Sequence, residues 1–152
     1  MEKIKLNKDQ IIEYTEIKPP FLMIDKVEEL TPGKSCHAIK ILNKDEWFFK
    51  CHLEKEEIMP GTLQIEAMLQ TLILTLYTLD THNKKLSFVK NINSNLISKI
   101  KPGNILYIYS VLSSYKRGIA KGKSHIEINK KIVSEGEFLL VSPHELMTLN
   151  KR

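Results

Sequence analysis

The stretch TLQIEAMLQTLILTLYTL, residues 62–79, is the most apolar part of the sequence and decides the fold. It contains no proline or glycine and is rich in good helix formers, so it predicts one long helix. At about 1.5 Å per residue such a helix would span about 27 Å, the width of a small domain. Apolar residues occur on all of its faces, so other parts of the protein must cover it on all sides.

A membrane-spanning helix is the alternative reading of this run. Gln64, Glu66 and Gln70 interrupt it, and the apolar residues that remain fall short of the roughly 18 or more that a span shows. We therefore expect a buried helix in a protein without a membrane span.

The flanking segments predict what covers the long helix. KDQIIEY (8–14) predicts a short amphipathic helix, and a turn is expected at KPGN (101–104), with a hairpin tip at Asn129-Lys130. Strand patterns occur at 35–42, 45–53, 86–92, 95–100, 105–117, 119–128 and 131–142. The economical arrangement is a curved antiparallel sheet wrapped around the helix, an α+β hot-dog fold. We expect a single domain over 1–152, with a peripheral helix and lead-in segment over 1–19.

Composition narrows the class of protein further. A chain of 152 residues, 42% hydrophobic and 27% charged, is typical of one ordinary globular domain. Cys36 and Cys51 form no disulfide framework, and the N-terminus is too interrupted by charge for a signal peptide, so we expect a cytoplasmic protein. The net charge of +5 suits an acidic partner, but no motif of a nucleic-acid-binding protein is present, so we expect no nucleic acid.

Three residues around the start of the long helix suggest chemistry. Glu66 is a lone carboxylate in an apolar segment; it is either solvated where the helix reaches the surface or functional, and the pattern alone leaves both open. His52 alone is more often structural, but with Glu66 it offers a base and an acid. Gly61 lies at the helix N-terminus, where a free N–H polarises a carbonyl oxygen. Together they suit proton abstraction next to a carbonyl.

Two other readings of the sequence fail. Cys36-His37 and Cys51-His52 are adjacent pairs, and neighbours on a strand point to opposite faces, so each pair supplies only one metal ligand easily. The GKS of TPGKS (31–35) lacks the first glycine of a phosphate-binding loop, because Glu28 occupies that position. We expect no metal.

The order of motifs resembles one enzyme family. PFLMIDKVEELTPGKSCHAIKILNKDEWFFKCH, IMPGTLQIEAMLQ and YKRGIAKGK are similar to segments of the FabZ-type 3-hydroxyacyl-[acyl-carrier-protein] dehydratases. The similarity runs colinearly over roughly residues 20–142, and the interval of 14 between His52 and Glu66 matches. The glutamate resembles the FabZ type, whereas the related isomerising FabA type has aspartate there.

The resemblance implies a mechanism and an assembly. His52 would remove the C2 proton of a (3R)-3-hydroxyacyl thioester, Glu66 would protonate the departing 3-hydroxyl, and the Gly61 amide would hold the thioester carbonyl. The product would be a trans-2-enoyl thioester of fatty-acid or specialised acyl biosynthesis. The family implies a homodimer or a trimer of dimers, with histidine and glutamate from different subunits. It implies no cofactor, since the acyl group arrives on the phosphopantetheine of an acyl carrier protein.

Further residues are candidates for binding. The acyl tunnel would be lined by Phe21, Phe48, Phe49, Pro60 and Met68, although ordinary core packing explains each apolar side chain as well. The acidic carrier protein would dock on cations near the tunnel mouth, which we expect to be Lys99, Lys101, Lys116, Arg117, Lys121 and Lys123.

The chain departs from the family directly after its histidine. CHLEKEE (51–57) stands where family members read GHFPGRP, so glycine and proline residues that fix the loop are missing. This favours a diverged member with a specialised substrate. A hot-dog acyl thioesterase, with Glu66 activating water, and a non-catalytic carrier-binding subunit are the alternatives.

Overall fold

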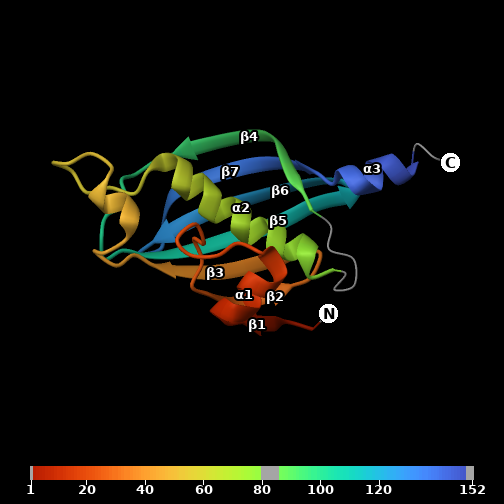
Figure 1. The fold of residues 1–152 in the computed structure, drawn as a ribbon, viewed down its shortest axis with the longest axis horizontal. Helices are drawn as coiled ribbons and strands as arrows, with labels where there is room; N and C mark the ends of the chain where they lie inside the picture. Colours follow the sequence, from red (N-terminus) through yellow and green to blue (C-terminus); the bar gives the residue numbers. More distant parts are fainter. Residues whose placement is uncertain (1, 80–85, 150–152) are drawn as a thin grey trace.

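The protein consists of a long helix packed against one face of an antiparallel sheet, as the computed structural model shows for residues 2–79 and 86–149 (Figure 1). The elements in chain order are β1 (Ile4–Leu6), α1 (Lys8–Thr15), β2 (Lys26–Thr31), β3 (Ser35–Ile41), the 3-10 helix η1 (Trp47–Lys50), α2 (Gly61–Tyr77), β4 (Phe88–Leu96), β5 (Ile105–Lys116), β6 (Ile119–Ile128), β7 (Lys131–Val141) and α3 (Pro143–Leu149). The seven strands are ordered β1-β2-β3-β5-β6-β7-β4. The predicted α+β class is confirmed.

Helix α2 is the centre of the core. It packs tightly on the sheet at Gly122 of β6, where a Cβ atom would lie 2.5 Å from Cδ1 of Leu72. Ser124 on the same strand donates a hydrogen bond of 3.3 Å to the carbonyl of Met68. Helix α1 and the segment before β2 pack on the side of α2 away from these strands (Figure 1). The sheet on one side and these segments on the other cover α2, which explains why most of its residues are buried.

The sheet bends around α2 (Figure 1). Irregular register occurs within the pairings of β4 with β7, β5 with β6, and β2 with β3. Such bulges bend strands and increase their twist. The curvature predicted from the need to cover the helix therefore has a local cause in these interruptions.

Short-range signals identified several elements correctly. The predicted helix at 8–14 is α1, which begins with a capping box between Asn7 and Gln10. The hairpin tip between β6 and β7 is Asn129-Lys130, and both residues have positive φ, as the tight two-residue turn requires.

Two predicted strand assignments are wrong. Residues 45–53 do not form a strand, because Phe48 and Phe49 are both buried and consecutive side chains of a strand point to opposite faces. They lie on η1 instead. The predicted strands 86–92 and 95–100 are one continuous strand, β4, after which the chain leaves the sheet and buries Ile100. No helix in the described part of the chain is long and apolar enough to cross a membrane.

Candidate active site around His52, Gly61 and Glu66

His52 follows η1 in a turn, and its imidazole is half-buried. Its Nδ1 lies 3.2 Å from the carbonyl oxygen of Ile58. A carbonyl only accepts hydrogen bonds, so Nδ1 carries the proton and the neutral ring keeps its lone pair on Nε2. The backbone thus selects the tautomer in which Nε2 is the basic atom.

The loop after His52 is held without the family's glycine and prolines. Leu53 has φ 53°, a left-handed conformation unusual for leucine, and its carbonyl accepts a hydrogen bond of 2.9 Å from the Glu56 N–H. The Glu56 carboxylate pairs with Lys99, and the hydrogen bond from this lysine lowers the pKa of Glu56. A turn and a surface ion pair therefore shape this loop.

Glu66 lies on the second turn of α2 and is half-buried. Its Oε1 accepts a hydrogen bond of 2.9 Å from Nε2 of Gln70. Gln70 is fully buried, and it also accepts 2.7 Å from the Met23 N–H and donates 3.0 Å to the Phe21 carbonyl. The carboxylate is thus oriented by a side chain that is itself fixed by two backbone hydrogen bonds.

Gln70 was not predicted as a site residue, although the sequence contains a signal for it. Residues four positions apart on a helix share a face, so a glutamine at i+4 from Glu66 in an apolar helix predicts a contact between the two.

The N-terminus of α2 is open at Gly61. Pro60 precedes it without a capping side chain, and among residues 2–79 and 86–149 no group accepts a hydrogen bond from the Gly61 N–H. A Cβ on Gly61 would collide with Cδ1 of Leu96, so the leucine lies directly over this glycine. The arrangement offers an unpaired N–H beside an apolar cover, which suits binding of a carbonyl oxygen.

The structure places the three groups on two neighbouring segments without joining them directly. His52 and Glu66 have separate partners, and no hydrogen bond or ion pair links the two side chains within the described chain. The two side chains are positioned independently. Each has one reactive atom without these bonds, Nε2 in His52 and Oε2 in Glu66.

The predicted tunnel residues fall into two groups. Phe48, Phe49 and Met68 belong to the hydrophobic core, where the two phenylalanine rings meet edge to face at 4.7 Å. Pro60 is half-buried and Phe21 is 49% exposed. Their role in binding an acyl chain stays a prediction, and Phe21 is the member whose side chain is accessible.

The predicted docking cations do not gather at one place. Lys99 and Lys101 precede β5, whereas Lys116 and Arg117 lie at its far end, in the turn to β6. Lys121 and Lys123 lie on β6 between these two ends. Any one contact surface for an acidic partner would take in only part of this set.

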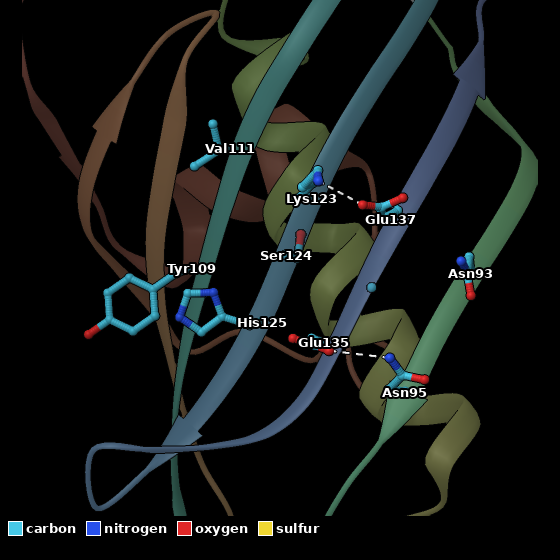
Figure 2. Close-up of a pocket in the computed structure, with 10 residues that line it drawn as sticks. Asn93, Asn95, Tyr109, Val111, Lys123, Ser124, His125, Glu135 and Glu137 are labelled. Atoms are coloured by element: carbon cyan, nitrogen blue, oxygen red, sulfur yellow. Dashed lines mark hydrogen bonds and ion pairs between the residues drawn. The ribbon is translucent and has the colours of Figure 1, made fainter.

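A groove of about 400 Å³ crosses the outer face of the sheet, on the side away from α2 (Figure 2). Lys123 pairs there with Glu137 at 2.7 Å, and Asn95 donates 3.2 Å to Glu135. The rings of Tyr109 and His125 stack with centroids 5.0 Å apart. The groove contains neither His52 nor Glu66, and its carboxylates offset the charge of Lys123.

Comparison with known proteins agrees with the fold. The chain is a hot-dog protein: it is similar to a chain of the solved structure "The Dehydratase Heterocomplex ApeI:P from Xenorhabdus doucetiae", with a TM-score of 0.71 and 16% identity over 93% of this chain and 97% of that chain. Residues 17–137 match the model of the FabA-like domain, so the chain belongs to the FabA-like family.

Two curated relatives align with this chain over most of its length. The 3-hydroxyacyl-[acyl-carrier-protein] dehydratase FabZ of Syntrophomonas wolfei is 34% identical over 140 residues, which cover 91% of this chain and 97% of the relative. The protein of the same name from Clostridium novyi is 36% identical over 131 residues, 82% of this chain and 92% of the relative. The predicted family resemblance is confirmed.

Proposed function

We propose that the protein dehydrates (3R)-3-hydroxyacyl groups carried on an acyl carrier protein. Nε2 of His52 takes the proton from C2, the C2–C3 double bond forms, and the C3–O bond breaks. The hydroxyl leaves as water with a proton from Glu66, which gives a trans-2-enoyl thioester. The Gly61 N–H holds the thioester oxygen, where negative charge develops during proton removal.

The observation that carries this proposal is the hydrogen bond from His52 Nδ1 to the Ile58 carbonyl. It leaves Nε2 as the base, the state that removal of a C2 proton requires. The geometry at Glu66 supports the complementary role, because Gln70 occupies Oε1 and leaves the second oxygen for the substrate hydroxyl. The names of the FabZ relatives support the substrate class.

The same proposal includes assembly of two copies through β4. This strand is the last in the sheet, and within residues 2–79 and 86–149 it pairs on one side only, with β7. It exposes the large apolar side chains Phe88, Val89, Ile92 and Leu96. An unpaired edge with apolar side chains pairs readily with another chain.

Docking of an acidic carrier protein is also part of the proposal. Lys101, Lys116, Arg117 and Lys121 have no ion pair in the part of the chain that the structure describes, so their charges are available to a partner. No cofactor beyond the carrier's phosphopantetheine arm is needed for the dehydration.

The test is mass spectrometry of a 3-hydroxyacyl carrier protein incubated with the wild type, His52→Ala and Glu66→Gln. We expect loss of one water with the wild type and not with either variant. Release of the free 3-hydroxy acid would identify a thioesterase instead, and no change with the wild type would identify a non-catalytic subunit. The left-handed Leu53 beside His52 favours the non-catalytic subunit as the second candidate. Turnover by both variants would exclude this site.

A further inference from the structure

A buried lysine forms its ion pairs with residues other than His52, Glu66 and Gly61. The side chain of Lys40, on β3, is only 7% exposed. Its Nζ lies 2.7 Å from Oε1 of Glu46 and 3.6 Å from Oδ1 of Asp25. Lysine is almost never buried unless it is paired, and a buried pair is costly to form. The two carboxylates that pair with Lys40 each belong to a segment that positions part of the candidate site.

Glu46 begins the segment that carries His52. It is the N-cap of η1, and its carbonyl accepts a hydrogen bond of 3.1 Å from the Phe49 N–H. Cys51 and His52 follow η1 without any intervening element. Trp47 adds a second attachment, because its Nε1 donates 3.1 Å to the Pro20 carbonyl.

Asp25 ends the segment that fixes Glu66. Its Oδ2 accepts a hydrogen bond of 2.7 Å from the Ile41 N–H, and its own N–H donates 2.8 Å to the Ile39 carbonyl. Just before it, Met23 and Phe21 make the two backbone hydrogen bonds that fix Gln70. Lys40 therefore pairs with two segments: residues 46–52, the arm that carries the base, and residues 21–25, the arm that orients the acid.

Around Lys40 the two arms are not held by side-chain packing alone, because a hollow lies between them and solvent. This hollow has a volume of about 380 Å³ and borders Lys40, Glu46 and Trp47. Asp25 has a second cation in Lys8, at 3.7 Å, but Lys40 is the only cation that the described residues place against Glu46. Loss of Lys40 would thus release the His52 arm first.

We propose that Lys40 is a positioning residue that fixes both the segment carrying the base His52 and the segment orienting the acid Glu66, through Glu46 and Asp25. Its effect on turnover rests on the proposed function, whereas its effect on the η1 turn does not. Two readouts separate the two: the rate at which a disulfide reagent labels Cys51, and turnover of the 3-hydroxyacyl carrier protein.

Cys51 is a reporter built into the arm. It is exposed, and its thiol donates weakly to the Trp47 carbonyl at 3.4 Å, so loosening of η1 frees it. Cys36 does not interfere, because burial raises the pKa of its thiol and keeps it protonated. We expect Lys40→Met to raise the labelling rate of Cys51 at least ~10-fold and to lower kcat at least ~10-fold with a smaller change in KM.

Two variants serve as controls. Lys3→Met removes a surface pair of similar length, 2.9 Å to Glu29, and should change neither readout. Lys40→Met combined with Glu46→Gln removes the unpaired carboxylate but leaves the arm untied, so both defects should persist. Recovery of wild-type labelling and kcat in this double variant would overturn the proposal, because the unpaired charge alone would then explain the defect.

A third variant keeps the proposal testable if Lys40→Met does not fold. Trp47→Phe keeps an aromatic ring but loses the bond to Pro20, and it should change both readouts in the same direction. Unchanged labelling and unchanged kcat in Trp47→Phe and in a folded Lys40→Met would refute the positioning role. If the wild type has no turnover, the proposed function fails, and Cys51 labelling alone decides whether Lys40 anchors the arm.

Discussion

Nε2 of Gln70 donates a hydrogen bond of 2.9 Å to Oε1 of Glu66, one helical turn away along α2. The same amide group bonds the Phe21 carbonyl, so the orientation of the candidate acid depends on a segment more than forty residues earlier in the chain. A carboxylate held this way has one oxygen fixed and one oxygen free. That asymmetry is what a proton donor to a single substrate hydroxyl needs.

Replacing Gln70 by leucine should separate this role from simple burial. Gln70→Leu leaves the Met23 N–H and the Phe21 carbonyl without partners, which should cost about 1–3 kcal/mol in the free energy of unfolding. It also frees Glu66, so kcat should fall by roughly 10-fold or more. Gln64→Leu is the comparison variant: this buried glutamine of the same helix bonds the Met59 carbonyl through Nε2, and its Oε1 has no partner among the described residues. Equal losses of kcat in both variants would contradict the role of Gln70.

Substitution of Gly61 tests the open helix N-terminus. The Cβ of Gly61→Ala would displace Leu96, whose side chain is exposed enough to move, so the fold should lose less than about 1 kcal/mol. Turnover should fall much more, because the methyl group and the displaced leucine obstruct the N–H. Adding Leu96→Ala should restore part of kcat. Urea unfolding and steady-state kinetics measure the two effects, and loss of stability without loss of kcat would contradict this assignment.

Leu53 should be strained, and glycine should relieve that strain. A non-glycine residue in the left-handed conformation costs roughly 1–2 kcal/mol, and the leucine side chain is exposed, so little burial is lost on its removal. We expect Leu53→Gly to raise the free energy of unfolding by up to about 1 kcal/mol. The equally exposed Leu86, which has no positive φ, provides the comparison: Leu86→Gly should give no gain. Chemical denaturation of both variants is the measurement.

The two cysteines should differ sharply in reactivity. Burial raises the pKa of the Cys36 thiol, whereas Cys51 is exposed, so a disulfide reagent at pH 8 should label one thiol per native chain and two in urea. Cys51→Ser should abolish native labelling. Rapid labelling of the Cys51→Ser variant in the native state would show that Cys36 is accessible.

His37 should make stability depend on pH. Its Nε2 is buried without a hydrogen-bond partner among the described residues, and burial lowers its pKa despite opposing contributions from Glu28, Glu29 and Glu127. The unfolded chain therefore binds the proton first as pH falls through about 6.5, so the free energy of unfolding should decrease below that pH.

The corresponding variant is His37→Phe, which keeps a ring to stack on Tyr109, now 4.3 Å from the imidazole. Urea titrations between pH 5 and pH 8 should show a smaller decrease in stability on the acid side for this variant than for the wild type. Parallel curves for the two proteins would mean that His37 does not contribute.

The elements that the sequence predicted correctly depend on local signals. An uninterrupted apolar run predicted α2, and an asparagine followed by a lysine between two alternating segments predicted the turn from β6 to β7. The strand assigned to 45–53 failed because aromatic residues favour strands as well as cores, and only the packing of Phe48 and Phe49 decides between them. The expectation of one domain over all 152 residues stays a prediction.

The residues of the candidate site were predicted from the sequence, and their catalytic roles stay predictions; the groups that support them were harder to predict. His52, Gly61 and Glu66 follow from motif and spacing, and inward alternation along β3 from Ala38 would have pointed to a buried Lys40. The bonds from Trp47 to Pro20 and from His52 to Ile58 were not predictable, because their acceptors are backbone carbonyls that no side-chain pattern marks.

Helix α2 begins after a proline, although a serine, threonine or aspartate there would stabilise it by about 1 kcal/mol. Such a side chain would accept a hydrogen bond from the first-turn N–H groups and occupy the space that the proposed binding of a thioester oxygen requires. Natural variants or designs that optimise this protein for thermal stability alone should therefore acquire a cap at position 60 and lose turnover. A screen for thermal stability alone would favour substitutions at position 60 that lower the proposed activity.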